Sequence, residues 1–294
     1  MNDTIGMIGL GNAGSALASA LSGRRPLVGY DTNPERQSAV ADMELTWMPS
    51  VEAVGGSAET ILLSLPKPEI SRAVVEELAR LAQSPRLIVE TSTVTPKVAV
   101  DLGEICKEAG IAFVDAAIGG GVQSMADGQV TFLVGGDAAD FEQAKPVLDL
   151  LAAKIHHLGP VGAGSGAKVV NNGVMHAFMV VLIEAGAMAK KLGIPMATLV
   201  EILGRSEGIS RPLEHRFRER MLNGDYDGGM SVMNARKDSV LALQTAQDYG
   251  VPLFATLAAH TPYEIADQMG MGDLDYASLA KLWESWCDLD FSEN

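Results

Sequence analysis

The stretch Thr4-Ile5-Gly6-Met7-Ile8-Gly9-Leu10-Gly11-Asn12-Ala13-Gly14 decides the fold of this 294-residue chain. An apolar strand pattern runs directly into a glycine-rich turn, and small residues at 15–21 then predict a helix. In a strand-turn-helix context, the first glycine permits a tight turn, the second lets the backbone approach a pyrophosphate, and the third allows close packing. The free N–H groups at the helix N-terminus attract phosphate. We therefore predict a dinucleotide-binding loop formed by Gly9, Leu10, Gly11, Asn12, Ala13 and Gly14; the alternative is a glycine turn in an ordinary βα unit.

A carboxylate ends the next predicted strand, at Asp31 in Val28-Gly29-Tyr30-Asp31. At this position a carboxylate accepts hydrogen bonds from both ribose hydroxyls, and its charge repels a 2′-phosphate. The expected cofactor is therefore NAD. Because Arg36 lies close in sequence, NADP is not excluded.

From Thr4 to about Leu158, short apolar runs alternate with longer segments of helical period. This alternation predicts a doubly wound parallel sheet of the α/β (Rossmann) class. Helix starts are indicated at Asn33-Pro34-Glu35 and Thr95-Pro96, where a polar capping residue precedes a proline. The predicted strands are Thr4–Gly9, Leu27–Asp31, Thr60–Leu65, Leu87–Glu90, Ile111–Asp115 and Thr131–Val134.

The pattern changes after the glycine-rich turn at 159–164. Beyond it only helical stretches are indicated, separated by Gly193-Ile194-Pro195, Asn223-Gly224-Asp225 and Gly250-Val251-Pro252. We predict two domains, 1–161 for the dinucleotide and 162–294 as an all-helical domain for substrate and dimerisation. The segment Ala167–Leu192 is expected to be one long helix between them, apolar on most faces and therefore buried between domains or subunits.

Composition narrows the class of partner. With 22 basic and 37 acidic residues the formal net charge is −15, which argues against nucleic acid and anionic membrane surfaces and favours small molecules. The start has no basic segment before an apolar run, and the apolar run Gly173–Ile183 is too short to span a bilayer. Only Cys106 and Cys287 are present, which supports neither a disulfide framework nor a metal site. We expect a cytoplasmic protein without a metal.

Five segments in order resemble the β-hydroxyacid dehydrogenases, the family of 3-hydroxyisobutyrate dehydrogenase and tartronate semialdehyde reductase. The resemblance covers nearly the whole chain. Beside the glycine loop it rests on Leu65-Pro66, Glu90-Thr91-Ser92-Thr93-Val94-Thr95-Pro96, Asp115-Ala116-Ala117-Ile118-Gly119-Gly120-Gly121, Gly162-Ala163-Gly164-Ser165-Gly166-Ala167-Lys168-Val169-Val170-Asn171-Asn172, and Lys237-Asp238.

This resemblance implies roles for single residues. Leu65, Pro66 and Thr93 would line the nicotinamide side of the cofactor, and Lys237 would close over it. Thr93 and the loop Gly119–Gly121 would also bind substrate. Lys168 argues against imine reductases, which share the architecture but usually lack this lysine, and Asn171 argues against 6-phosphogluconate dehydrogenases, which have histidine there.

Lys168 is the predicted acid/base of the reaction. Oxidising an alcohol needs a hydride acceptor and a base for the hydroxyl proton, and the reverse reaction needs the conjugate acid. Lys168 and Asn172 stand four apart on a predicted helix and therefore share one face. Burial lowers the pKa of a lysine toward the range where it serves as base and acid. Asn172 would orient the substrate.

The sequence departs from the family pattern at the substrate loop. Gly119 replaces a serine, so one hydrogen bond to the substrate carboxylate is missing unless Gln123 or Ser124 supplies it. Met230 stands where the family tends to have phenylalanine. Arg211 begins a basic run through Arg218 that is either a solvated face or a site for a distal anionic group of the substrate.

We therefore expect a nicotinamide-dependent oxidoreductase that interconverts a small 3-hydroxy acid and its semialdehyde, as a homodimer or homotetramer. One alternative is a reductase of the same fold acting on a substrate that lacks the usual carboxylate. Another is a non-catalytic dinucleotide-binding redox sensor, against which the pair Lys168 and Asn172 speaks.

Overall fold

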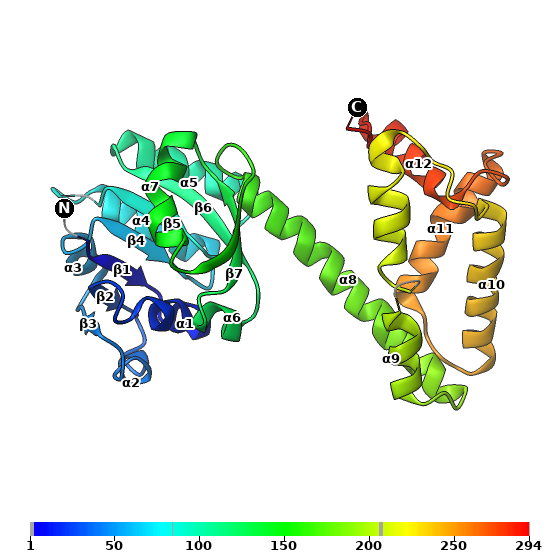
Figure 1. Ribbon diagram of the computed structural model, residues 1–294, viewed down its shortest axis with the longest axis horizontal. Helices are drawn as coiled ribbons and strands as arrows, with labels where there is room; N and C mark the ends of the chain where they lie inside the picture. Colours follow the sequence, from blue (N-terminus) through cyan, green and yellow to red (C-terminus); the bar gives the residue numbers. More distant parts are fainter. Residues whose placement is uncertain (1–2, 84, 206–207, 294) are drawn as a thin grey trace. The chain divides into compact units, whose positions relative to one another are not determined.

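The computed structural model describes residues 3–83, 85–205 and 208–293. Its contacts form two compact units, Met1–Gly173 and Val174–Asn294. The long helix α8 (Ala163–Lys191) contributes residues to both units (Figure 1).

An eight-stranded sheet in the order β3-β2-β1-β4-β5-β6-β7-β8 forms the centre of the N-terminal unit (Figure 1). Each neighbouring pair is parallel except β6 and β7, which are antiparallel. The connection from β6 to β7 holds only a short helix, too little chain for a crossover, so β7 turns back. The strands are β1 (Ile5–Ile8), β2 (Leu27–Tyr30), β3 (Leu45–Trp47), β4 (Thr60–Leu63), β5 (Leu87–Glu90), β6 (Ala112–Gly119), β7 (Val130–Gly135) and β8 (Ala152–His157).

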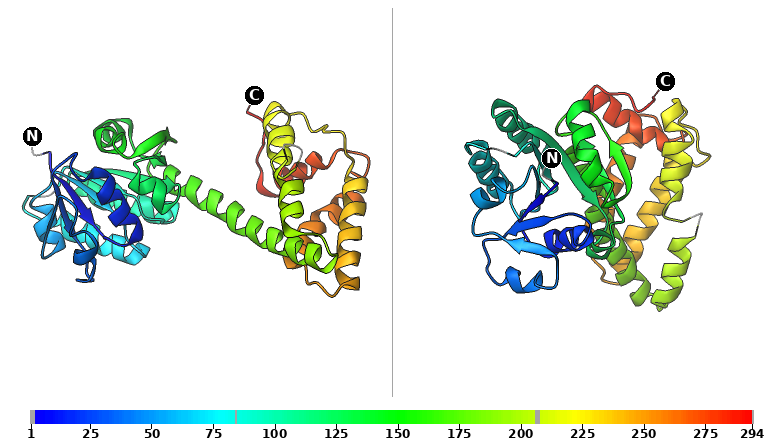
Figure 2. Two further views of the ribbon diagram at one scale, coloured as in Figure 1. Left: turned by 60° about the horizontal axis from the view of Figure 1, so that its bottom comes forward. Right: turned by 60° about the vertical axis from the view of Figure 1, so that its left-hand side comes forward.

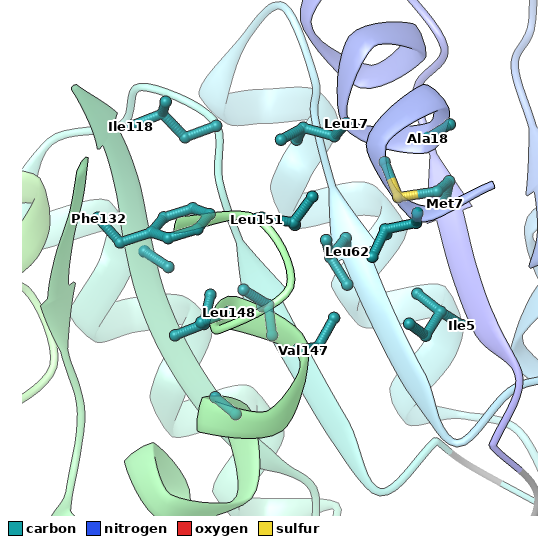
Figure 3. Packing of buried hydrophobic residues seen from close by; sticks show 14 of the residues in the cluster. Ile5, Met7, Leu17, Ala18, Leu62, Ile118, Phe132, Val147, Leu148 and Leu151 are labelled. Carbon is teal, nitrogen blue, oxygen red and sulfur yellow. The ribbon is translucent and has the colours of Figure 1, made fainter. Parts of the chain in front are cut away.

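Helices cover both faces of this sheet. They are α1 (Asn12–Leu21), α2 (Arg36–Ala39), α3 (Val51–Gly55), α4 (Pro68–Ala79), α5 (Pro96–Glu108), α6 (Val122–Ala126) and α7 (Ala138–Leu148). On one face Leu17 of α1 and Leu148 of α7 pack with Met7 and Phe132 of the strands (Figure 3). The opposite face packs against α3, α4 and α5 in a second cluster. Burying a side chain of this size stabilises the fold by about 1.5–3 kcal/mol.

The strand order places a binding crevice at one edge of the sheet. The order reverses between β1 and β4, because β2 and β3 lie on one side of β1 and the later strands lie on the other. Ligands of open α/β sheets bind where the carboxyl ends of the strands meet such a switch point. The loops after β1, β2, β4, β5 and β6 are therefore the ones that carry the site.

The C-terminal unit is helical, as Figure 2 shows from two further directions. Its described elements after α8 are α9 (Met196–Gly204), the π-helical turn η1 (Pro212–Arg218), the 3₁₀ turn η2 (Met221–Asn223), α10 (Val232–Asp248), α11 (Phe254–Gln268), the 3₁₀ turn η3 (Tyr276–Leu279) and α12 (Ala280–Cys287). The three predicted breaks fall between α8 and α9, after η2 and between α10 and α11, as expected. Gly224 adopts φ +69° at its break, which explains a glycine there.

The predicted fold class is confirmed, with corrections to single elements. All six predicted strands are present, but β6 runs on to Gly119, so the first residue of the predicted substrate loop Gly119–Gly121 belongs to the strand. The short β3 and the polar β8 were not predicted. Both are edge strands, which lack the continuous apolar pattern of a strand buried on both faces. Thr95 caps α5 as predicted, its hydroxyl accepting from the Val98 amide, whereas the start at Asn33-Pro34 leads only to the four-residue α2.

The long helix α8 begins at Ala163, four residues earlier than predicted. By length and composition α8 would also pass for a membrane span, which the sequence analysis did not expect. Its buried Glu184 nevertheless makes protein contacts, accepting hydrogen bonds from the amides of Ala255 (2.8 Å) and Thr256 (3.0 Å) at the start of α11. A carboxylate inside a bilayer is costly, so this contact favours a helix packed against protein.

Candidate active site

The glycine loop has the geometry that its sequence predicts. Gly9 adopts φ +90°, and a Cβ there would overlap the carbonyl oxygen of Ser64. A Cβ on Gly14 would overlap the carbonyl oxygen of Gly9, so helix α1 approaches the turn closely only because this residue is glycine. A Cβ on Gly11 would meet nothing within 4 Å, which leaves its backbone open to a ligand.

Asp31 holds the loop through its side chain. One carboxylate oxygen accepts a hydrogen bond from the amide of Leu10 at 2.7 Å, and the other accepts from the amide of Asn33 at 2.8 Å. Leu10 contributes its backbone here, since its side chain is fully buried in the core. Asp31 thus joins the loop after β1 to the loop after β2.

A cavity of about 440 Å³ opens between these loops. The lining of this cavity fits a dinucleotide. The backbone of Gly11 and the first turn of α1 offer N–H groups to phosphate, and the Asp31 carboxylate offers an acceptor to ribose. Arg36 lines the same cavity, so a cation is also available to a 2′-phosphate. The predicted residues among its lining are Gly9, Gly11, Asn12, Ala13, Asp31, Leu65 and Pro66.

Asp115 fixes the start of α8 to the sheet. Its two oxygens accept hydrogen bonds from the amides of Gly162 (2.7 Å) and Ser165 (2.6 Å), two of the donors that a helix start leaves unpaired. Burial raises the pKa of Asp115, while the hydrogen bonds from Gly162 and Ser165 act in the opposite direction. Gly164 lets the helix approach, because a Cβ there would overlap the carbonyl oxygens of Leu133 and Asp115.

Lys168 lies one turn further along α8. Its Nζ donates a 2.6 Å hydrogen bond to the carbonyl oxygen of Ile118 near the end of β6. The side chain is partly buried, and this burial lowers the pKa of the lysine. Asn172, also partly buried, follows at the four-residue spacing that places it on the same helix face.

The glycine loop of the predicted substrate site follows Ile118 directly. Gly120 and Gly121 are exposed, and Gly120 adopts φ +139°, which side-chain-bearing residues rarely do. Gly119 pairs with Thr131 in the sheet, and a Cβ on Gly119 would make only ordinary contacts, 3.5 Å from the Thr131 carbonyl oxygen. Glycine is therefore not sterically required at 119.

Leu65 and Thr93 belong to neighbouring loops at the carboxyl edge. The amide of Leu65 donates a 2.7 Å hydrogen bond to the hydroxyl of Ser92, which ties the loop after β4 to the loop after β5. Thr93 is exposed beside this contact. Sequence reasoning did not assign roles to Asp115, Ser92 or the Ile118 carbonyl, although all three lie inside the quoted motifs.

Two predicted site residues belong to the C-terminal unit. Lys237 lies on α10 and forms an exposed ion pair with Asp238 at 3.0 Å. Arg211 immediately precedes η1. Within the run that follows, the prediction of a solvated basic face fails at Arg216, which is buried and paired with Asp275 at 3.1 and 3.2 Å.

The Arg216–Asp275 pair also supports the segment around Met230. The Met230 amide donates to Asp275 at 2.7 Å, and the Arg216 guanidinium stacks on the ring of Tyr276 at 3.7 Å. Arg216 and these backbone hydrogen bonds lower the pKa of Asp275, although burial alone would raise it. Among the described residues, no group of three His, Cys, Asp or Glu side chains is arranged to hold a metal ion.

Both halves of the chain match known protein families. The model of the NAD binding domain of 6-phosphogluconate dehydrogenase matches residues 4–159. The model of the NAD-binding domain of NADP-dependent 3-hydroxyisobutyrate dehydrogenase matches residues 162–283. Fold and loop geometry thus define an oxidoreductase with a nicotinamide dinucleotide as cofactor.

Individual relatives agree with these matches. The 2-(hydroxymethyl)glutarate dehydrogenase of Eubacterium barkeri is 30% identical over 292 residues, covering 98% of this chain and 97% of the relative. The solved structure of Mycobacterium tuberculosis 3-hydroxyisobutyrate dehydrogenase with L-serine is 27% identical, covers 96% of this chain and 99% of that one, and has a TM-score of 0.65. An imine reductase of Myxococcus stipitatus, solved with NAD+, shares the fold at 20% identity and a TM-score of 0.81, covering 96% of this chain and 99% of that one. The chain belongs to the β-hydroxyacid dehydrogenase family.

Proposed function

We propose that this oxidoreductase interconverts a small 3-hydroxy acid and its semialdehyde, with Lys168 as acid and base. The observation that carries the proposal is the hydrogen bond from Lys168 Nζ to the Ile118 carbonyl oxygen, which holds the ammonium beside Gly119–Gly121. Relatives named for hydroxy acid substrates support the substrate class.

Each residue has a defined task in this proposal. In reduction Lys168 gives a proton to the carbonyl oxygen of the substrate, and in oxidation it takes the proton of the hydroxyl group. Asn172, on the same face of α8, orients that oxygen, while the exposed amides of Gly120 and Gly121 bind the carboxylate. The nicotinamide supplies or accepts the hydride when it is bound.

The cofactor is proposed to lie along the cavity after β1. The phosphates would meet the backbone of Gly9, Gly11 and the start of α1, and the ribose would meet Asp31, which favours NAD over NADP. Leu10, Asn12, Ala13 and Gly14 complete the loop, and Leu65, Pro66 and Thr93 would line the nicotinamide side. By the family resemblance, Lys237 would contact the cofactor. Arg211, which begins the basic run through Arg218, would bind a distal anionic group of the substrate.

A substrate without the usual carboxylate is a second candidate, favoured by Gly119. A Cβ at this position would make only ordinary contacts, so the backbone leaves room for a side chain while one hydroxyl donor is absent. The missing hydrogen bond to a charged group would be worth about 1.5–3 kcal/mol.

The assembly and location belong to the same proposal. Apolar side chains of α8 are exposed in the single chain, among them Val170 (68%) and Ile183 (59%). Exposed apolar side chains on several faces of one helix indicate an interaction surface, and we propose a cytoplasmic homodimer or homotetramer. We propose the domain boundary at 161/162, since the first family match ends at residue 159 and the second begins at residue 162.

A panel assay tests the function. Purified protein is given NADH and a series of semialdehydes with carboxylate, phosphonate or sulfonate groups, together with aldehydes and ketones without an anionic group. NADH binding is measured separately by fluorescence. Turnover with the carboxylates supports the main proposal. Turnover only with the phosphonates, the sulfonates or the substrates without an anionic group supports the second. Binding of NADH without any turnover would contradict both and indicate a sensor.

A further inference from the structure

Glu90 is a buried carboxyl group that the proposed reaction does not use. It ends β5, is 1% exposed, and stands in register with Asp115 of β6. One oxygen, Oε1, accepts a 2.8 Å hydrogen bond from the amide of Ser92. The other, Oε2, is buried and has no hydrogen-bond partner among the described residues, and the same holds for the Ser71 hydroxyl of α4. A buried polar atom without a partner is costly, so a functional explanation is required.

Ser92 connects Glu90 to the cofactor cavity. Its amide donates to Glu90, and its hydroxyl accepts the 2.7 Å hydrogen bond from the amide of Leu65. Leu65 lines the cavity and also packs against the glycine loop, since a Cβ on Gly9 would lie 3.0 Å from Leu65 Cδ2. A shift of Ser92 would therefore be transmitted to the loop that holds Leu65 and Pro66.

The hydrogen-bond partners distinguish the two neighbouring carboxyls. Asp115 has a backbone donor on each oxygen, as a carboxylate requires, whereas Glu90 has a backbone donor on Oε1 only. Burial raises the pKa of Glu90, the Ser92 amide and the nearby side chains of Ser92 and Ser71 act in the opposite direction, and the charge of Asp115 adds to the increase. A proton on Oε2 would remove the repulsion between the pair and would turn this oxygen into a donor for the nearby Ser71 hydroxyl, which can accept.

We propose that Glu90, as a neutral carboxylic acid, is a positioning residue: through Ser92 it holds the backbone of Leu65 and thereby places the Leu65–Pro66 segment against the nicotinamide half of the cofactor. This inference rests on the proposed function, because that function assigns the segment to the nicotinamide side. Glu90 itself touches neither cofactor nor substrate.

Binding of two ligands separates this role from general damage to the fold. ADP-ribose contains the adenine, ribose and phosphate groups of NADH but lacks nicotinamide. Dissociation constants of both ligands are measured for the wild-type protein, Ser92→Ala, Glu90→Gln and Glu90→Leu, together with melting temperatures. Thr91→Val is the matched control, because the Thr91 hydroxyl donates a buried 2.6 Å hydrogen bond to the carbonyl of Leu63 on β4, whereas Ser92 bonds the amide of Leu65.

The proposal predicts that Ser92→Ala and Glu90→Leu weaken NADH binding about 10-fold, a change of about 1.4 kcal/mol, and leave ADP-ribose binding within about twofold. Glu90→Gln, which resembles the neutral acid, retains wild-type affinity for both ligands. Thr91→Val lowers the melting temperature without changing either affinity. Equal weakening of both ligands, or unchanged NADH binding in Ser92→Ala, would overturn the proposal. Failure of the wild-type protein to bind NADH would instead contradict the proposed function.

Discussion

The ammonium of Lys168 donates a 2.6 Å hydrogen bond to the carbonyl oxygen of Ile118, the residue that precedes Gly119. This contact joins α8 to the end of β6, so the proposed proton donor and the proposed carboxylate loop keep a constant separation. An ammonium has three donors, and the bond to Ile118 uses one of them. The other two remain for a substrate oxygen.

Asp115 is expected to control catalysis through the position of α8. Asp115→Ala leaves two buried amides of the helix start without acceptors, which should lower the free energy of unfolding by about 2–4 kcal/mol. Because Lys168 lies one turn away, kcat should fall about 10- to 100-fold. Urea unfolding and steady-state kinetics measure the two effects. Asp140→Ala is the control, since Asp140 of α7 accepts a 3.1 Å hydrogen bond from the amide of Phe113 in β6 and not from α8. An equal loss of kcat in both variants would refute a specific role of Asp115.

Asp31 is expected to select the cofactor. Asp31→Asn keeps an acceptor oxygen for the Leu10 amide but removes the charge that repels a 2′-phosphate. Affinity for NADH should fall, and affinity for NADPH should rise, by about 10-fold each, with Arg36 available to the added phosphate. Fluorescence titration with both cofactors measures this. A wild-type protein that binds NADPH more tightly than NADH would disprove the preference.

Gly119 is expected to limit affinity for carboxylate substrates. Gly119→Ser introduces a hydroxyl on a Cβ that makes only ordinary contacts, with its nearest atoms 3.5 and 3.6 Å away. If the physiological substrate carries the usual carboxylate, KM should fall by about 10-fold or more, equivalent to about 1.5–3 kcal/mol. Ala139→Ser, at an exposed position of α7, serves as the control, because it adds a hydroxyl away from the substrate loop. An increase in KM would show that the natural substrate needs the space left by glycine.

Glu184 is expected to stabilise the C-terminal unit in a pH-dependent way. Burial raises its pKa, but hydrogen bonds from Ala255 and Thr256 at the start of α11 outweigh this and leave the pKa below its ordinary value. The stabilisation is therefore present above the pKa of the unfolded chain and is lost as the pH falls through the lower folded value.

Glu184→Gln should accordingly cost about 1.5–3 kcal/mol near neutral pH and progressively less in acid. Urea unfolding at a series of pH values measures the difference. The exposed Glu201→Gln of α9 should show no such difference at any pH. A constant penalty for Glu184→Gln from neutral to acid pH would exclude the carboxylate as its source.

Features encoded by neighbouring residues were predictable from the sequence. The glycine loop, Asp31 and the strands buried on both faces follow from short patterns, and the four-residue spacing of Lys168 and Asn172 places them on one helix face. The edge strands β3 and β8 lack such a pattern, because one side of each is unpaired and their burial is incomplete.

Contacts between distant segments were not predictable. Asp115 caps a helix start 47 and 50 residues away, Lys168 finds the Ile118 carbonyl at a separation of 50, and Arg216 meets Asp275 at a separation of 59. Any residue provides a backbone carbonyl, so Ile118 carries no signal in its side chain. The basic run around Arg216 predicted either a solvated face or a site for an anionic group of the substrate, and only the folded unit shows the buried Asp275 as its partner.

The most direct test of the account is the kcat of Lys168→Ala with the best substrate of the panel, compared with the wild-type protein at equal saturation with NADH. The account predicts a loss of at least about 100-fold, as expected for removal of a general acid, with the dissociation constant of NADH changed by less than about twofold. A variant that retains more than a few per cent of wild-type kcat would contradict the assignment of Lys168 as the acid and base.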